Sequence, residues 1–193
     1  MQEPARGLHP AQQAEAATST RKPEGSLRSV FLVGFMGAGK SSVGQALARR
    51  LGWPFEDLDQ RIVTGEKRSI EEIFRESGEA AFRQAEHKAL AELVAELGSG
   101  PRVVALGGGT MVQPGNAALL EQAKAHLVFL DAPVEELFRR CQQEAVERPL
   151  GKDADQFSRL YQDRRPHYGK AAARIETSGK TIEAVAAEIA QGL

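Results

Sequence analysis

The sequence contains very little cysteine and no long hydrophobic run. Cys141 is the single cysteine among 193 residues, so the chain cannot form an internal disulfide or a zinc cluster built from several cysteines. No apolar run approaches the roughly 20 residues that span a bilayer, and the first residues lack the apolar stretch of a secretory signal. We therefore expect a cytoplasmic protein that works in a reducing compartment and does not act at a membrane.

The sequence also carries almost no net charge. Its 25 basic and 26 acidic residues leave a formal charge of −1. This balance argues against a general affinity for nucleic acid or for acidic membranes, so a functional cation must act at one defined place. The hydrophobic content of 41% suits one globular domain with its own core.

Residues 1–27 differ in composition from the rest of the chain. They contain no aromatic residue and are rich in Ala, Gln, Glu, Pro, Ser and Thr. Glu3, Glu15 and Glu24 count against an organelle transit peptide, because such peptides are poor in acidic residues. We expect a disordered tail over residues 1–27 and one domain over residues 28–193, with a partner-binding role of the tail left open.

Short apolar runs alternate with amphipathic stretches over residues 28–193. The runs predict five strands, at residues 30–33, 54–57, 102–106, 126–130 and 173–176, of which 54–57 is the weaker, and continuous apolar runs fit strands that are covered on both faces. The stretches between them predict helices at residues 42–51, from 70 onward after the cap Ser69, and at 79–97, 133–141 and 181–190. This alternation predicts an α/β fold, a three-layer α/β/α sandwich around a five-stranded parallel sheet. The polar residues 142–155 have little pattern and predict a mobile lid.

A complete phosphate-binding motif follows the first predicted strand. Residues 34–41 read GFMGAGKS, which matches G-x-x-x-x-G-K-[ST] between a strand and a helix. Glycines let the backbone N–H groups turn inward around phosphate, the helix N-terminus adds positive potential, and Lys40 can reach the β- and γ-phosphates. We expect the residues of this loop that bind ATP to be Gly37, Ala38, Gly39, Lys40, Ser41 and Ser42.

The phosphate loop alone leaves several classes of nucleotide-binding protein open. One short domain leaves little room for the coupling machinery of an ATPase motor. GTPases read guanine through an N-K-x-D motif, which this sequence lacks. A small kinase of the P-loop NTPase fold is therefore the class that the sequence favours.

Four further segments narrow the class by resemblance. They are FEDLD at 55–59, SIEEIF at 69–74 leading to GE at 78–79 and FRQAE at 82–86, GGG at 107–109, and RPL at 148–150. With the phosphate loop, their order and spacing resemble the shikimate kinase family over about residues 30–190. The resemblance implies transfer of a phosphoryl group from ATP to the 3-hydroxyl of shikimate. It also implies one Mg²⁺ ion per subunit and a monomer that binds no nucleic acid.

The resemblance implies roles for the acidic pair and for a lid arginine. Ser41 and Asp57 are expected to hold Mg²⁺, and Asp59 is expected to accept the proton of the substrate hydroxyl. Lys40, Asp59 and Arg148 form the expected catalytic set, with Arg148 reaching across the phosphates from the lid. The alternative for the pair is a solvated turn in which Asp59 is the N-cap of a helix. The alternative for Arg148 is an exposed loop arginine.

The resemblance also implies a site for the substrate carboxylate. Arg83 and Arg164 match the two carboxylate-binding arginines of the family, and a guanidinium presents two parallel N–H donors to a carboxylate. Arg165 remains an alternative to Arg164, and both Arg83 and Arg164 can also be surface helix residues. The remaining substrate contacts are expected from the backbone of Gly107, Gly108 and Gly109. Phe74 and Phe82 either line the pocket or pack in the core.

The adenine site departs from the family pattern. The arginine often found under adenine has no direct match, because Cys141 falls near that place, and Arg140 is the substitute that we expect. Residues 177–180 are expected on the far side of adenine, without the usual proline. Two other functions stay open at this stage, another small-metabolite kinase such as a gluconate kinase and a non-catalytic shikimate-binding relative. The latter would be favoured by loss of Lys40, Asp59 or Arg148, and all three residues are present.

Overall fold

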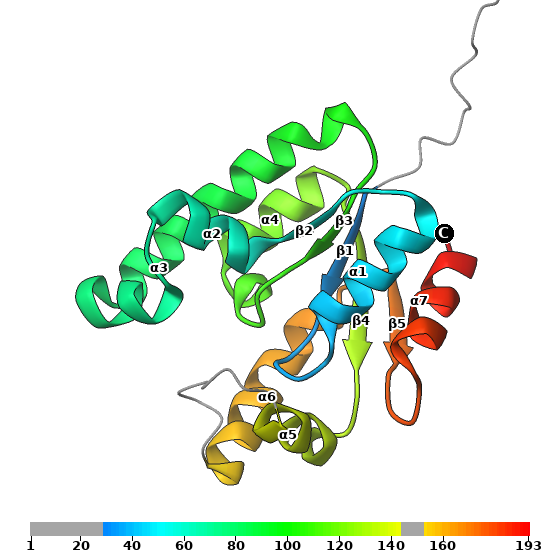
Figure 1. Ribbon diagram of the computed structural model, residues 1–193. Helices are drawn as coiled ribbons and strands as arrows, with labels where there is room; N and C mark the ends of the chain where they lie inside the picture. Colours follow the sequence, from blue (N-terminus) through cyan, green and yellow to red (C-terminus); the bar gives the residue numbers. More distant parts are fainter. Residues whose placement is uncertain (1–28, 144–152) are drawn as a thin grey trace, which may run out of the picture.

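A computed structural model describes residues 29–143 and 153–193 of the chain. Residues 1–28 and 144–152 lie outside this description, and with them the predicted tail, most of the predicted lid and Arg148. Figure 1 shows one central sheet flanked by helices. The predicted α/β/α fold with a parallel sheet of five strands is confirmed.

The five strands all run in the same direction, in the order β2-β3-β1-β4-β5. Their bounds are β1 Val30–Val33, β2 Phe55–Asp57, β3 Val103–Ala105, β4 His126–Asp131 and β5 Ala173–Glu176. Strands β1 and β3 lie in the middle and every one of their residues is buried, as the continuous apolar runs predict. Loops that follow neighbouring parallel strands leave from the same edge of a sheet, so the segments after β1, β2 and β3 meet there.

Seven α-helices and two short 3₁₀ helices are described. The α-helices are α1 Lys40–Leu51, α2 Leu58–Glu66, α3 Ile70–Ala95, α4 Pro114–Gln122, α5 Val134–Gln143, α6 Ala154–Tyr168 and α7 Ile182–Gln191. The 3₁₀ helices are η1 Glu96–Ser99 and η2 Thr110–Val112. Helices α1 and α7 pack side by side against one face of the sheet, and α3, α4 and α6 lie on the other side (Figure 1).

Helix α3 contains a break at a single glycine. Gly78 has φ 79° and ψ 175°, a conformation that is essentially restricted to glycine. The two helices that the sequence predicts, one capped by Ser69 and one beginning near residue 79, are the two halves on either side of this break. Ser69 and Glu72 form a capping box at the start of the first half.

Candidate functional site

The phosphate loop connects β1 to α1 at the carboxyl edge of the sheet. Gly37 and Gly39 adopt φ values of 78° and 84°, which favour glycine. A Cβ atom on Gly37 would lie 2.5 Å from the carbonyl oxygen of Leu137 and 2.9 Å from Sγ of Cys141. Position 37 therefore requires glycine both for its backbone conformation and for its close contact with α5. The loop thus has the backbone conformation that the phosphate-binding motif predicts.

Lys40 and Ser41 lie where this loop opens α1. The Lys40 ammonium donates to the carbonyl oxygens of Gly34 and Phe35, at 3.0 and 2.9 Å. The Ser41 hydroxyl donates to Oδ2 of Asp57, at 2.6 Å. A cavity of about 100 Å³ lies among Lys40, Ser41, Asp57 and Asp59. The phosphate loop and the acidic pair therefore share one small polar space.

The two aspartates have different positions relative to α2. Asp57 is the N-cap, and its Oδ1 accepts hydrogen bonds from the backbone N–H groups of Asp59 and Gln60, at 3.0 and 3.4 Å. The alternative in which Asp59 caps this helix is wrong. Because Asp57 also accepts from Ser41 through Oδ2, its side chain is fixed between the helix and the phosphate loop.

Each glycine of the turn after β3 lies close to one residue that is predicted to bind the substrate. A Cβ atom on Gly107 would lie 2.9 Å from Oδ1 of Asp59, and one on Gly109 would lie 2.8 Å from Nη1 of Arg83. The corresponding position on Gly108 is 3.8 Å from Nη1 of Arg164. The structure thus gathers Asp59, Arg83 and Arg164, from three separate helices, around the turn that the sequence singled out.

Arg83 is held by two carboxylates of its own helix. Its Nη1 donates to Oε2 of Glu86 at 3.0 Å, and its Nε and Nη2 both donate to Oε1 of Glu79, at 3.2 and 3.1 Å. Glu86 is buried and also accepts the hydroxyl of Thr110, at 2.7 Å. Sequence reasoning assigned no role to Glu86 or Thr110. Since Glu86 lies three positions after Arg83 on a predicted helix, the spacing was a signal for this pair.

The adjacent arginines Arg164 and Arg165 point to different places. Arg164 is half-buried, with its guanidinium carbon 5.9 Å from the centre of the Phe35 ring. Burial lowers the pKa of the Arg164 guanidinium, and the neighbouring positive charge of Arg83 acts in the same direction. Arg165 is exposed and donates to Oδ2 of the buried Asp131, at 3.1 Å. Of the two, Arg164 lies at the glycine turn.

Arg140 lies between the phosphate loop and residues 177–180. It donates to the side-chain and main-chain oxygens of Thr177, at 3.0 and 3.1 Å, and to the carbonyl oxygen of Gly37, at 3.5 Å. Its second Nη donates to Glu136 at 2.6 Å. The pKa of Glu136 is lowered by a hydrogen bond from the Ser178 hydroxyl and by Arg140. Arg140 and residues 177–180 are thus adjacent, as the expected adenine site requires.

The two phenylalanines of α3 differ in burial. Phe82 belongs to the core, whereas Phe74 is 39% exposed, and their ring centres are 4.7 Å apart. The guanidinium carbon of Arg83 lies 5.1 Å from the centre of the Phe82 ring. Phe82 therefore packs in the core, and its ring also contacts the guanidinium group of Arg83.

The described part of the chain contains neither a cluster of metal-binding side chains nor a membrane-spanning helix. Over residues 29–143 and 153–193, no group of three or more His, Cys, Asp or Glu side chains could hold a metal ion. Within the same ranges, no helix is both long enough and apolar enough to cross a membrane.

The parallel sheet, the phosphate loop, and the Arg83 and Arg164 side chains at the neighbouring glycine turn define a P-loop kinase of small size. The family model for shikimate kinase matches residues 36–193. The chain is 45% identical to the shikimate kinase of Geobacter metallireducens over 90% of this chain and 96% of that protein. It is 39% identical to the shikimate kinase of Persephonella marina over 84% and 97% of the two chains. The chain therefore belongs to the shikimate kinase family.

Solved structures agree with this assignment. The shikimate kinase of Acinetobacter baumannii in complex with shikimate superposes with a TM-score of 0.79, at 35% identity, over 86% of this chain and 92% of that one. A gluconokinase from Sinorhizobium meliloti has a TM-score of 0.52 at 18% identity, which shows the shared fold alone. The family and the enzyme class that the sequence predicts are confirmed.

Proposed function

We propose that this chain transfers the γ-phosphoryl group of ATP to the 3-hydroxyl of shikimate, giving shikimate 3-phosphate and ADP. The observation that supports this reaction is the meeting of Asp59, Arg83 and Arg164 at the glycine turn Gly107–Gly109, beside the phosphate loop. Such a place offers a carboxylate for a hydroxyl group and two guanidinium groups for an acid. Shikimate carries both groups on one ring.

The phosphate loop and Lys40 bind the triphosphate in this proposal. The two main-chain carbonyls that accept from Lys40 belong to the loop itself, so nucleotide binding exchanges them for β- and γ-phosphate oxygens. Gly37, Ala38, Gly39, Ser41 and Ser42 supply backbone and hydroxyl donors, and Arg140 lies at the adenine end. Positive charge placed before the reaction stabilises the charge that spreads over the transferring group.

Asp59 acts on the attacking hydroxyl. The oxygen of the 3-hydroxyl forms a bond to the γ-phosphorus while the bond from that phosphorus to the bridging oxygen of ADP breaks. The proton of the hydroxyl passes to the Asp59 carboxylate, and ADP leaves with the electron pair of the broken bond. Asp59 suits this role because it is adjacent to the cavity that holds Lys40 and faces Gly107.

The residues present fit one Mg²⁺ ion. Ser41 and Asp57 offer a hydroxyl and a carboxylate oxygen that already contact each other at 2.6 Å, and Mg²⁺ prefers oxygen ligands completed by phosphates and water. When bound, the ion supplies positive charge to the phosphate oxygens of ATP. Because Asp57 is fixed by the start of α2, this carboxylate is held ready at the loop.

Arg83 and Arg164 bind the carboxylate of shikimate. The exposed Glu79 takes up two donors of Arg83 through a single oxygen, and water screens this ion pair on the Glu79 side. A substrate carboxylate can therefore replace Glu79 at low cost, while the buried Glu86 keeps the guanidinium in place. Half-burial of Arg164 strengthens its attraction to an anion, because water screens the pair less.

The remaining parts of the proposal extend beyond the described residues. Arg148 completes the catalytic set from residues 144–152, and this assignment stays a prediction. The proposed active form is a monomer, as the sequence predicts. Size-exclusion chromatography with light scattering checks the proposed monomer.

One coupled assay of ADP release tests the function. The panel contains shikimate, gluconate and further hydroxy acids, each with ATP and magnesium salt. We expect turnover with shikimate, little turnover with gluconate, and a loss of at least about a hundredfold in Lys40→Ala. Faster turnover of gluconate would favour the sugar-acid kinase. Shikimate binding by calorimetry without any turnover would favour the non-catalytic relative.

A further inference from the structure

Tyr168 contacts the glycine turn at which the proposed substrate binds. It is the last residue of α6, its side chain is 1% exposed, and its hydroxyl donates a hydrogen bond to the carbonyl oxygen of Gly108. Its ring packs against Phe129 of β4, with the ring centres 5.3 Å apart. The tyrosine therefore joins the sheet, the end of α6 and the glycine turn.

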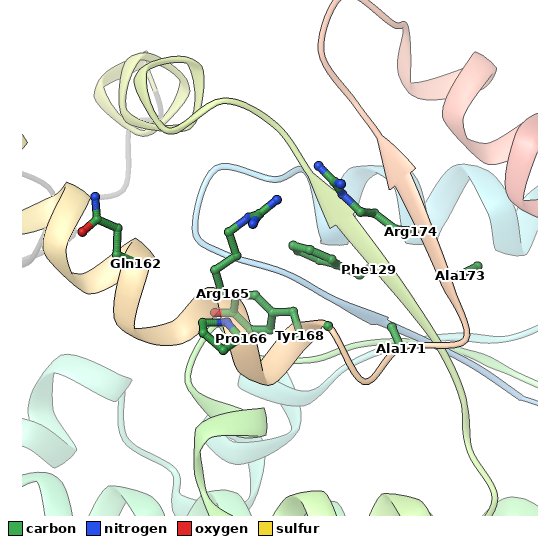
Figure 2. Close-up of a pocket in the computed structure, with 9 residues that line it drawn as sticks. Phe129, Gln162, Arg165, Pro166, Tyr168, Ala171, Ala173 and Arg174 are labelled. Atoms are coloured by element: carbon green, nitrogen blue, oxygen red, sulfur yellow. The ribbon is translucent and has the colours of Figure 1, made fainter.

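A cavity lies beside the end of α6 that carries Tyr168. This cavity has a volume of about 460 Å³, and Figure 2 shows Tyr168, Phe129, Arg165 and Arg174 around it. The ring itself is buried, and its hydroxyl bond to Gly108 joins it to the turn.

The Gly108 carbonyl belongs to the peptide group that leads to Gly109. A peptide group is planar, so fixing its carbonyl oxygen also fixes the direction of the Gly109 N–H. Gly108 lies against the phosphate loop and Arg164, since a Cβ atom there would be 3.6 Å from the Met36 nitrogen and 3.8 Å from Nη1 of Arg164. Gly109 lies against Arg83. One peptide group therefore sits between both arginines.

We infer that Tyr168 is a positioning residue for the acceptor substrate, because its hydroxyl fixes the Gly108–Gly109 peptide between Arg83 and Arg164. This inference rests on the proposed function, since it assumes that the acceptor binds at the glycine turn. Tyr168 acts through the turn. Its burial raises the pKa of the Tyr168 phenol, so the hydroxyl stays protonated and remains a donor at neutral pH.

Tyr168→Phe tests the inference because it removes one oxygen atom and keeps the ring. We expect the KM for shikimate to rise about three- to tenfold, the size of one lost hydrogen bond, with kcat and the KM for ATP changed less than about twofold. The dissociation constant of shikimate, measured by calorimetry without nucleotide, should rise by the same factor.

Tyr161→Phe is the matched control on the same helix. The Tyr161 hydroxyl donates to Oδ1 of Asp131 at 2.9 Å, and so the variant loses an equivalent bond to a buried acceptor away from the glycine turn. Its KM for shikimate should stay within about twofold of the wild-type value. An equal rise of KM in both variants, or no rise in Tyr168→Phe, overturns the inference.

Amide hydrogen exchange in the ligand-free protein gives a readout that does not depend on the acceptor. Exchange of residues 108–110 should be faster in Tyr168→Phe than in the wild type and in Tyr161→Phe. Unchanged exchange contradicts the positioning role even if shikimate is the substrate. Absence of shikimate binding by the wild type contradicts the proposed function instead, and leaves the exchange result to decide whether Tyr168 holds the turn.

Discussion

At the scale of single residues, the two neighbouring arginines of α6 have different roles. Arg164 is proposed to bind the substrate, whereas Arg165 forms an ion pair within the fold. Arg164 lies at the glycine turn, whereas Arg165 and Arg174 share one carboxylate oxygen of the buried Asp131, at 3.1 and 2.8 Å. Successive residues of a helix point about 100° apart, so the two side chains extend in different directions. Their substitution by alanine should therefore have different kinetic effects.

Arg164→Ala should lose roughly thirty- to a hundredfold in kcat/KM for shikimate, mainly through KM. The reason is that a charge-assisted contact to the substrate carboxylate is worth on the order of 2 to 3 kcal/mol and does not involve the moving phosphoryl group. Steady-state kinetics with varied shikimate check this. Arg165→Ala is the control and should leave that KM within about twofold. A larger effect of Arg165→Ala would exchange the two roles.

Gly109→Ala should disturb Arg83 without straining the backbone. Gly109 has φ −104°, which alanine adopts readily, yet its Cβ atom would lie 2.8 and 2.9 Å from the two terminal nitrogens of Arg83. Displacing a binding group by about 1 Å can cost up to a hundredfold, so we expect about a tenfold rise in the KM for shikimate with little change in melting temperature.

Gly115→Ala provides the comparison for this prediction. A Cβ atom on Gly115 would make an ordinary contact of 3.6 Å with His87, and the residue lies within α4. This variant should keep the wild-type KM. If both variants bind shikimate equally well, the contact between Gly109 and Arg83 has no role in recognition.

Local motifs were easier to predict from the sequence than the contacts between distant residues. A phosphate loop, an acidic pair and a glycine triplet are local patterns, and each is found at the carboxyl edge of the sheet. The choice between Arg164 and Arg165 depends on how α6 is rotated against the sheet. The contact of Tyr168 with Gly108 spans 60 positions in the chain. Neither fact follows from a local pattern.

At the scale of secondary structure, strands were easier to predict than helices. The five strands lie within about two residues of their expected bounds. The buried strands β1 and β3 are continuous apolar runs, whereas β2 is half-buried and β5 alternates between half-buried and exposed residues. Helices α2, α4 and α6 were not predicted. Helix α2 buries only Leu58 and Ile62, α4 begins with Pro114 and Gly115, and α6 contains Pro166 near its end. Helices with few buried residues, or with Pro or Gly among their residues, lack a clear apolar stripe in the sequence.

The break in α3 gives a prediction for stability. Gly78 has a backbone conformation that alanine adopts only with strain, while the space around its Cβ position is open. Gly78→Ala should therefore destabilise the fold by about 1 to 3 kcal/mol through backbone strain alone. The urea midpoint of unfolding measures this loss.

Gly65→Ala is the matched variant for the break. Gly65 also has open space around its Cβ position, but it lies in α2 without a positive φ. This substitution should be neutral or stabilise the protein by up to about 1 kcal/mol. Equal midpoints for the two variants would show that α3 can straighten at residue 78 without cost.

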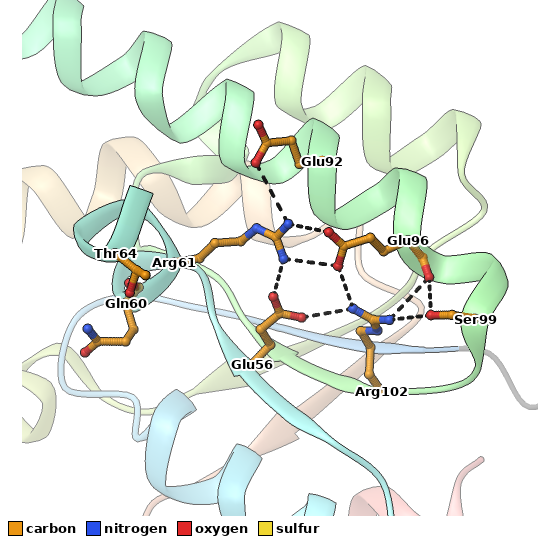
Figure 3. A network of polar contacts seen from close by, with 8 residues as sticks. All are labelled: Glu56, Gln60, Arg61, Thr64, Glu92, Glu96, Ser99 and Arg102. Carbon is orange, nitrogen blue, oxygen red and sulfur yellow. Dashed lines mark hydrogen bonds and ion pairs between the residues drawn. The ribbon is translucent and has the colours of Figure 1, made fainter. Parts of the chain in front are cut away.

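At the scale of the whole molecule, the proposed shikimate site draws residues from elements on both sides of the phosphate loop. Asp59 and Arg83 belong to α2 and α3, whereas Arg164 belongs to α6 (Figure 1). A network of charged side chains ties α2 and α3 to the sheet (Figure 3). In it, Arg61 pairs with Glu56 and Glu96, and Arg102 joins the same two carboxylates at 3.1 and 3.2 Å.

Carboxylates of this network and of two helix ends should make the free energy of unfolding depend on pH in the acid range. The pKa of Glu96 is lowered by its hydrogen bond with Arg61, that of Glu72 by the backbone of Ser69, and that of Glu136 by Ser178. A carboxylate with a lowered pKa binds protons less readily in the folded state than in the unfolded state. Its stabilising effect is therefore complete above the ordinary glutamate pKa of about 4.3 and is lost as the pH falls through the folded value.

The urea midpoint should accordingly hardly change from pH 7 to about pH 5 and then fall steadily toward pH 3. Glu96→Gln should lower the urea midpoint at pH 7. It should also make the decrease of the midpoint below pH 5 shallower, because one of the three carboxylates with a lowered pKa is gone. Glu183→Gln removes the same charge from the first turn of α7, outside this network, and should keep the slope of the wild type. A midpoint that rose on acidification, or an equal slope for Glu96→Gln and the wild type, would show that the Arg61–Glu96 pair does not couple folding to protonation.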